Sequence, residues 1–431
     1  MKSMSKRGED RISALPKSLI CHILSFIPTV EAVRTTVLSK SWNRVWTGVT
    51  TLDFNDDRDV RRFLDFDMFV NRVLSFRDAT DIQKFKLETW HLDDLDVFEG
   101  WIYAAMWRNV QELHIAFRPG ATYYVIPGVL FDCKSLRALR LEIGANPIRY
   151  DCPPPWSFRK LKFFHVTFDN PDDELAERIF SCCPVVEAMI IDGQANAMQY
   201  EFIVGAPELK SLTISLDDPD ENDFQINAPN LENLVLKSVS LSNYNLQSVR
   251  SLDSASISFV DISVSEKPSF PTRATALLAG ISDVKCLSLS IHSFEVSYLP
   301  AAFINLKKLD LLLHKLKYWE LLAELLNRAP QLEDLVLEDK TECGHEHTDF
   351  ECNPPEAVPV CLLSQLKTIT IKGFKGQRVE MGVVKYLLNN GHVLTELTLY
   401  SGLLPAEANE MYKKFLMFRM AKGCVVKFRK M

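Results

Sequence analysis

A six-residue phrase recurs along most of this chain and limits what the chain can fold into. The phrase is an apolar residue, two residues of any kind, a second apolar residue, one residue of any kind, and a third apolar residue. From one middle position to the next the step is 25 residues, then 25, 23 and 22, as read at Leu139, Phe164, Met189, Leu212 and Leu234. A step this regular is typical of repeat proteins, in which copies of one unit stack side by side.

The last two apolar positions of each phrase are two residues apart, so they point to the same face of a short strand. One such strand cannot bury that face alone, whereas stacked neighbours form a continuous core and a solenoid. Both the period and the phrase resemble leucine-rich repeats. A full repeat of that kind places Asn or Cys three residues after its last apolar position. Other residues stand there in this chain, which predicts an irregular solenoid: Gly144, Asp169, Gln194, Asp217 and Val239.

Apolar residues at helical spacing lie between several of the predicted strands. They predict helical returns over 63–76, 94–110, 316–327 and 379–388. Near the end, residues 405–420 predict one more helix, which caps the last repeat, and Cys424 to Phe428 predict a final strand beside the strand at Leu397.

Length and composition agree with a folded protein of more than one domain. The chain has 431 residues, of which 47% are hydrophobic and 24% charged. Its net charge of −7 argues against nucleic acid as the main partner, because neutralising phosphates needs an excess of Lys and Arg. No signal peptide and no membrane-spanning run is recognised, so we expect no membrane partner, free cysteine thiols, and a location in the nucleus, the cytoplasm or both.

Residues 10–46 lack the repeat phrase and predict three short helices. The first begins at Pro16, a favoured first helical position, and the second is expected to be capped by Thr29. The third is expected to be capped by Ser39 and to carry Trp42 and Trp46. A module this small cannot easily bury by itself the wide apolar arc that the first helix carries, formed by Leu19, Ile20, Ile23, Leu24, Phe26 and Ile27. The arc therefore either docks onto the first repeats or binds another protein.

Two stretches resemble known plant domains. Residues 10–16 (DRISALP), 23–29 (ILSFIPT) and 37–40 (VLSK), with Trp42 and Trp46, resemble a plant-type F-box, although Lys17 and Ser18 replace residues that are often acidic in that family. Residues 358–374, 386–390 and 424–428 resemble the FBD region that follows leucine-rich repeats in plant F-box proteins.

This resemblance implies an α/β fold: a short three-helix F-box at 8–48, an irregular leucine-rich-repeat solenoid of parallel strands with helical returns at 49–356, and an FBD-type cap at 357–431. The family implies a non-catalytic substrate receptor of a Skp–cullin–F-box ubiquitin ligase. Its F-box binds a Skp-type adaptor, and through it a cullin, while the repeats hold a protein substrate of unknown identity. By resemblance the adaptor-binding residues are Leu15, Pro16, Leu19, Ile20, Ile23, Leu24, Ile27, Leu38, Trp42 and Trp46.

Residues between the apolar strand positions are the expected substrate contacts: Arg140, His165, Thr213 and Asp310. The histidines at such positions, His114 and His165, are expected to face the open side of the solenoid without a catalytic role. We expect no cofactor.

Three alternatives remain open at this stage. The first is a repeat scaffold that does not direct ubiquitination. The second is a receptor for a small ligand, and the third is a hydrolase or metal enzyme. The enzyme hypothesis rests on a cluster of Cys and His residues, which are common zinc ligands: Cys343, His345, His347 and Cys352. Their spacing fits no common zinc finger and favours a solvated loop.

Overall fold

The computed structural model describes most of the chain. The described residues are 12–59, 65–90, 94–117, 124–130, 133–143, 148–150, 158–169, 183–194, 201–217, 222–238, 241–259, 269–290, 295–313, 318–339, 357–402, 405–415, 417–418, 421 and 423–430. The chain divides into two compact units, residues 1–195 and 196–431.

The first unit begins with the helical module. Its helices are α1 (Lys17–Leu24) and α2 (Thr29–Arg34), followed by single 3₁₀ turns at Thr35–Val37, Lys40–Trp42 and Trp46–Gly48. The prediction of a third helix through Trp42 and Trp46 is therefore wrong, because two separate 3₁₀ turns stand there. Ser39 does precede the turn at Lys40–Trp42, but its hydroxyl bonds that of Ser41 instead of capping the turn.

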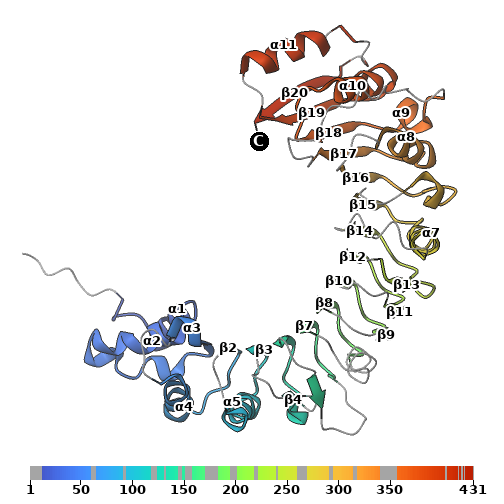
Figure 1. The fold of residues 1–431 in the computed structure, drawn as a ribbon. Helices are drawn as coiled ribbons and strands as arrows, with labels where there is room; N and C mark the ends of the chain where they lie inside the picture. Colours follow the sequence, from blue (N-terminus) through green and yellow to red (C-terminus); the bar gives the residue numbers. More distant parts are fainter. Residues whose placement is uncertain are drawn as a thin grey trace, which may run out of the picture. The chain divides into compact units, whose positions relative to one another are not determined.

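A parallel sheet follows in the first unit. Its strands pair in the order β1 (Thr51–Asn55), β2 (Lys84–Thr89), β3 (Glu112–Phe117), β5 (Ala138–Ile143), β7 (Phe163–Asp169) and β8 (Ala188–Gln194). The helices between the first strands are α3 (Asp56–Asp59), α4 (Phe66–Phe76) and α5 (Leu95–Trp107), and α4 and α5 lie along one face of the sheet (Figure 1). The remaining described elements of this unit are a short pair of strands, β4 (Tyr124–Ile126) and β6 (Ile148–Tyr150), and a 3₁₀ turn at Gly128–Leu130.

The second unit repeats the same architecture. Its parallel strands pair in the order β10 (Ser211–Asp217), β12 (Asn233–Ser238), β14 (Ser254–Phe259), β15 (Cys286–Ser290), β16 (Lys308–Leu313), β17 (Asp334–Asp339), β18 (Thr368–Lys372), β19 (Glu396–Ser401) and β20 (Val425–Lys430). Its helices are α7 (Phe270–Gly280), α8 (Tyr318–Arg328), α9 (Val360–Ser364), α10 (Arg378–Asn390) and α11 (Pro405–Phe415), and a 3₁₀ turn lies at Val296–Tyr298.

The strand register confirms the predicted repeat. The middle position of each phrase lies directly opposite the next, as Leu113 opposite Leu139 and Leu139 opposite Phe164 show. In the second unit the same row joins Leu212 to Leu234 and ends with Leu397 opposite Val426. Side chains in these rows are almost fully buried, so they are the continuous core that the period predicts.

Three of the returns in the second unit are strands instead of helices. β9 (Glu201–Gly205), β11 (Asp223–Asn227) and β13 (Asn243–Asn245) form a second parallel sheet. Their aromatic rings stack at the same strand position, with 4.6 Å between the ring centroids of Phe202 and Phe224 and 5.1 Å between those of Phe224 and Tyr244. This aromatic column is a satellite core behind the main sheet.

The end of the chain is built as predicted. β20 pairs with β19, and the buried Phe415 of α11 lies 5.8 Å from Phe428 and 6.2 Å from Phe374, between ring centroids. The α/β class, with N-terminal helices followed by a long run of parallel strands, is confirmed. Across the described ranges, no helix has both the length and the apolar character needed to cross a membrane.

Candidate functional site

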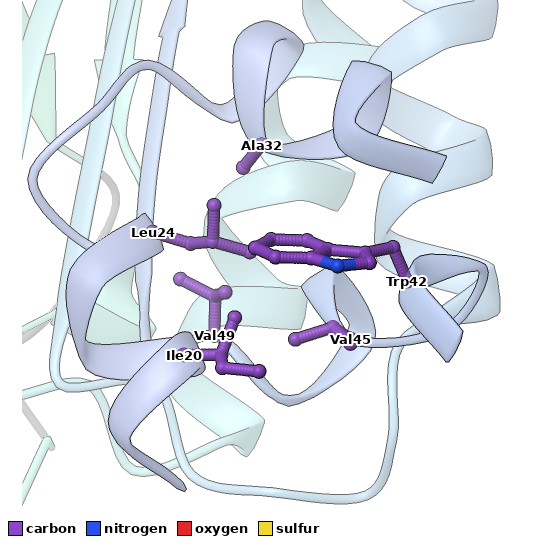
Figure 2. Packing of buried hydrophobic residues seen from close by; sticks show 6 residues of the cluster. All are labelled: Ile20, Leu24, Ala32, Trp42, Val45 and Val49. Atoms are coloured by element: carbon purple, nitrogen blue, oxygen red, sulfur yellow. The ribbon is translucent and has the colours of Figure 1, made fainter. Parts of the chain in front are cut away.

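The N-terminal module has its own small core, which determines which of its apolar side chains remain available to a partner. Figure 2 shows the indole ring of Trp42 crossing the middle of a buried cluster. The other members come from α1, α2 and the turn that leads into β1: Ile20, Leu24, Ala32, Val45 and Val49. Leu15, Cys21 and Trp46 are partly buried and pack against this cluster.

Polar contacts fasten the module to the first repeat. The hydroxyl of Thr29 accepts a hydrogen bond of 2.7 Å from the backbone N–H of Asp53 in β1. Thr29 is therefore the first residue of α2 and a bridge to the sheet, where the sequence predicted a helix cap. Arg77, which follows α4, donates from its guanidinium to the carbonyl of Val49. Burial, together with the nearby Arg108, lowers the pKa of Arg77 to about 10, so it stays charged at neutral pH.

The ten predicted adaptor-binding residues fall into three groups. Ile20, Leu24 and Trp42 are buried in the module core, so their side chains support the face from inside. Leu15 and Trp46 are half-buried against that core. The remaining five are exposed: Pro16, Leu19, Ile23, Ile27 and Leu38.

Two further exposed apolar residues, Phe26 and Val37, were not among the predicted contacts. Phe26 follows α1 and Val37 ends the first 3₁₀ turn, where 85% of its surface is open to solvent. The sequence places Phe26 in the apolar arc of the first predicted helix and Val37 in the apolar stripe of the second, so the pattern alone did not distinguish them from core residues. Single exposed apolar residues are ordinary, but this many within one module whose core is already complete mark an interaction face. We call Leu19, Ile23, Phe26, Ile27, Val37 and Leu38 the apolar face.

A second candidate region is the sheet face of the first unit that lies away from α4 and α5. In strand register, Lys86, His114, Arg140 and His165 stand opposite one another on β2, β3, β5 and β7. Acidic and hydroxyl side chains form the next row of the same face, two residues further along each strand. That row includes Glu88, Glu142, Thr167 and Asp192.

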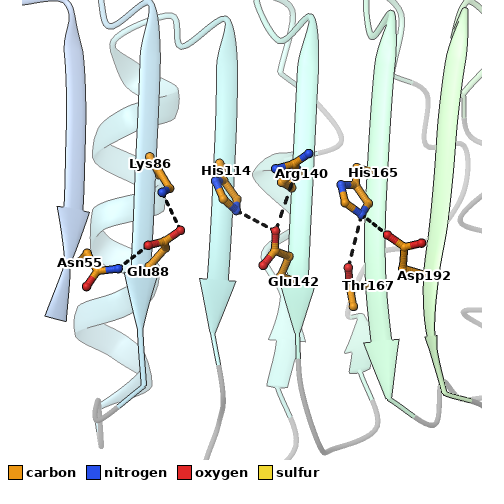
Figure 3. A network of polar contacts seen from close by, with 9 residues as sticks. All are labelled: Asn55, Lys86, Glu88, His114, Arg140, Glu142, His165, Thr167 and Asp192. Carbon is orange, nitrogen blue, oxygen red and sulfur yellow. Dashed lines mark hydrogen bonds and ion pairs between the residues drawn. The ribbon is translucent and has the colours of Figure 1, made fainter. Parts of the chain in front are cut away.

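The two rows are joined by hydrogen bonds and ion pairs, some within one strand and some between neighbouring strands (Figure 3). Lys86 Nζ lies 2.6 Å from Glu88 Oε1, and His114 Nε2 lies 3.1 Å from Glu142 Oε1. His165 Nε2 lies 2.7 Å from Asp192 Oδ2. These contacts hold the polar side chains of the face in fixed positions.

Two carboxyl groups of this network have shifted pKa values. The pKa of Glu142 is lowered, chiefly by its hydrogen bond from His114 and further by the positive charge of Arg140. Burial raises the pKa of Glu88, but the hydrogen bonds from Lys86 and Asn55 outweigh it, so the net shift is also downward.

The four predicted substrate contacts differ in how accessible they are. Arg140 is half-buried, with 41% of its side chain exposed. His165 keeps only 8% of its surface exposed, so it lies on the predicted face but is covered by its neighbours. In the second unit Thr213 and Asp310 are half-buried at equivalent strand positions, and Asp310 Oδ2 lies 3.6 Å from Lys308 Nζ.

The cysteine and histidine residues at 343–352 lie outside the described residues. Within the part that the structure describes, no three His, Cys, Asp or Glu side chains converge as a metal site would require. The described cysteines are free thiols: Cys21, Cys133, Cys183, Cys286, Cys361 and Cys424.

Comparison with known domain families gives three matches along the chain. Residues 12–52 match the F-box domain, residues 98–257 match the leucine-rich repeats of the FBD-associated F-box protein At5g56370, and residues 353–399 match the FBD region.

Curated proteins of Arabidopsis thaliana are similar over nearly the whole length. The F-box/FBD/LRR-repeat protein At3g52680 is 29% identical over 94% of this chain and 88% of its own length. The F-box/FBD/LRR-repeat protein At2g04230 is 30% identical, with 94% and 92% covered. The FBD-associated F-box protein At4g13985 is 30% identical, with 97% and 95% covered.

Proposed function

Since this chain belongs to the family of plant F-box proteins with leucine-rich repeats and an FBD region, we propose that it is the substrate receptor of a Skp–cullin–F-box ubiquitin ligase. An F-box domain implies a Skp-type adaptor as partner, and leucine-rich repeats imply protein binding. Members of this family are in general non-catalytic adaptors. The cullin, the ubiquitination role and the substrate are the parts that we propose.

In this proposal the F-box occupies 8–48, the repeats 49–356 and the FBD region 357–431. The apolar face of the F-box binds the adaptor, which bridges to the cullin. The repeats hold the substrate, so that its lysines meet a ubiquitin-charged enzyme at high local concentration. In this proposal the chain positions the substrate, and its partners carry out the covalent chemistry.

The observation that carries the proposal is the apolar face itself. The module core is closed around Trp42 without the side chains of this face, yet Leu38 leaves 64% of its surface exposed. Burying apolar surface contributes about 25 cal/mol per Å². Several such side chains on one small module supply a binding face for a partner that covers them together.

The test is co-purification of the full chain with a recombinant Skp-type adaptor. Leu19→Asp combined with Ile23→Asp puts two charges on the apolar face without entering the module core. We expect adaptor binding to be lost while the melting temperature is kept. The matched control is Phe76→Asp, which charges an exposed apolar residue of α4 outside the F-box and should leave adaptor binding unchanged.

Undiminished adaptor binding by the double variant would remove the apolar face from the proposal. Absence of adaptor binding by the unaltered chain would favour the alternative, a repeat scaffold or ligand receptor that does not direct ubiquitination. A second double variant, Leu15→Ala with Pro16→Ala, tests the segment before α1 in the same way. We expect it to lose co-purification with the adaptor while the repeats stay folded.

A further inference from the structure

The open face of the first unit is hollowed over β2, β3, β5 and β7. The hollow has a volume of about 450 Å³, and its charged lining is mostly basic: Lys84, Lys86 and Arg140 against one acid, Glu112. The imidazole of His114 lies between them in the same lining. Ala138 and Phe163, both half-buried, form an apolar part of the lining. The hollow therefore combines positive charge with a small apolar floor.

Charge is graded along the strands of this face. The acidic partners Glu88 and Glu142 are one same-face position further along their strands than Lys86 and Arg140, and they do not line the hollow. Successive same-face residues are about 6.6 Å apart along a strand. Glu88 and Glu142 therefore contact Lys86 and Arg140 from the side away from the hollow, and the two basic side chains line the hollow on their other side.

Two of the basic side chains have only weak partners among the described residues. Arg140 Nε lies 4.0 Å from Glu142 Oε1, beyond hydrogen-bonding distance, and no described side chain or carbonyl accepts a hydrogen bond from this guanidinium. Lys84 Nζ lies 3.6 Å from Glu112 Oε2, with 50% of the lysine side chain exposed. Exposed pairs of this kind contribute little, so a ligand carboxylate can replace them at small cost.

The same surroundings argue against a nucleic acid in the hollow. Glu88, Glu112 and Glu142 surround the basic row and would repel a chain of phosphates, and the net charge of the whole chain is −7. A peptide segment with one or two carboxylates next to an apolar side chain matches both the basic side chains of the hollow and its apolar floor.

We infer that this hollow binds an acidic segment of the protein substrate. A carboxylate of the segment meets the guanidinium of Arg140 and the ammonium of Lys84, and a neighbouring apolar side chain lies on Phe163 and Ala138. Arg suits this role because its planar group binds a carboxylate through two hydrogen bonds. The inference rests on the proposed function, since it names the class of substrate that the repeats hold.

The test starts from a displayed library of random twelve-residue peptides, selected on the immobilised full chain. We expect the selected peptides to be enriched in Asp and Glu with an apolar residue within two positions. The best peptide is then synthesised with a fluorescein label, and its Kd is measured by fluorescence polarisation.

The variants separate the hollow from general surface charge. Arg140→Glu should raise the Kd on the order of tenfold or more, and Lys84→Glu should raise it in the same direction. Arg140→Lys keeps the charge without the planar group and should fall between. The matched control is Arg159→Glu, an exposed arginine outside the hollow, which should leave the Kd within about twofold.

Three results would overturn the inference: selected peptides without acidic enrichment, a Kd that Arg140→Glu leaves unchanged, or displacement of the peptide by a short single-stranded oligonucleotide whose own binding is lost in Arg140→Glu. Adaptor co-purification is measured on the same preparations. If the unaltered chain binds the adaptor but selects no acidic peptide, only the inference fails. If it does not bind the adaptor, the proposed function fails whatever peptides are selected.

Discussion

The indole Nε1 of Trp42 donates a hydrogen bond of 2.7 Å to the hydroxyl of Ser13, although the two residues are 29 positions apart. Ser13 lies two residues before Leu15, and Trp42 is the central ring of the module core. This bond therefore fastens the segment that precedes α1 to the turn at Lys40–Trp42, and with it one edge of the candidate adaptor site.

Ser13→Ala should loosen the N-terminal module. The substitution leaves a largely buried indole N–H without its acceptor, which costs about 1–3 kcal/mol. The measurement is hydrogen exchange of the α1 amides, because it reports local opening in a chain with more than one unit. Ser18→Ala, at an exposed position of α1, is the control. Equal protection of α1 in both variants would contradict this account of the bond.

Leu212→Asp should disrupt the solenoid core of the second unit. Leu212 is fully buried opposite Leu234, so an unpaired charge there costs several kcal/mol. Thr213→Asp is the matched control, since it puts the same group on the opposite face of the same strand. We expect the melting temperature to fall strongly only for Leu212→Asp. Similar melting temperatures for the two variants would show that the assigned strand face is wrong.

A chain that ends at Tyr400 should expose the end of the solenoid and aggregate. It lacks β20, whose basic residues Lys427 and Arg429 keep the last strand soluble, and it lacks the buried Phe415. The measurement is size-exclusion chromatography with light scattering, together with melting of the truncated and full chains. A monomer with an unchanged melting temperature would show that residues 401–431 are an independent appendage.

Phe415→Ala tests the same cap in the full-length chain. The ring is fully buried between Phe374 and Phe428, and its removal should cost about 3–5 kcal/mol. Met417→Ala is the control, because Met417 is exposed two residues later. Equal melting of the two variants would exclude a capping role for Phe415.

Glu142→Gln should change how stability depends on pH. The hydrogen bond from His114 lowers the pKa of Glu142 in the folded chain, so its contribution is present above the unfolded pKa of about 4.3 and is lost as pH falls through the folded value. The variant should melt below the wild type at pH 7, and this gap should close toward pH 3. Because a third of the side chain is exposed, the gap is small.

His114→Gln provides the partner measurement. If His114 is the main cause of the shift, the gap that Glu142→Gln produces at pH 7 should shrink in a His114→Gln background. A gap that stays constant from pH 7 to pH 3 would assign the loss to packing instead of charge.

The strand register and the repeat were determined by the sequence itself. In a strand the side chains alternate with a period of two, so the apolar phrase alone specifies which residues face the core. Leu139, Phe164 and Met189 therefore stand opposite one another as predicted, and so do Ile369 and Leu397. Helices such as α5 and α10 were predicted for the same kind of reason, because their apolar spacing of about 3.6 residues is local information.

Only the tertiary structure decided which apolar residues of the F-box are core and which form its surface. Leu19 and Ile20 are neighbours of similar hydrophobicity in one apolar arc, yet Ile20 is buried and Leu19 exposed. The difference arises because the ring of Trp42 packs against only part of that arc. The bond between His114 and Glu142 depends in the same way on stacking, since the two residues are 28 positions apart and meet only when β3 and β5 pair in register. Such contacts form because packing distant segments together lowers the free energy, and the spacing of apolar residues within one segment does not predict that packing.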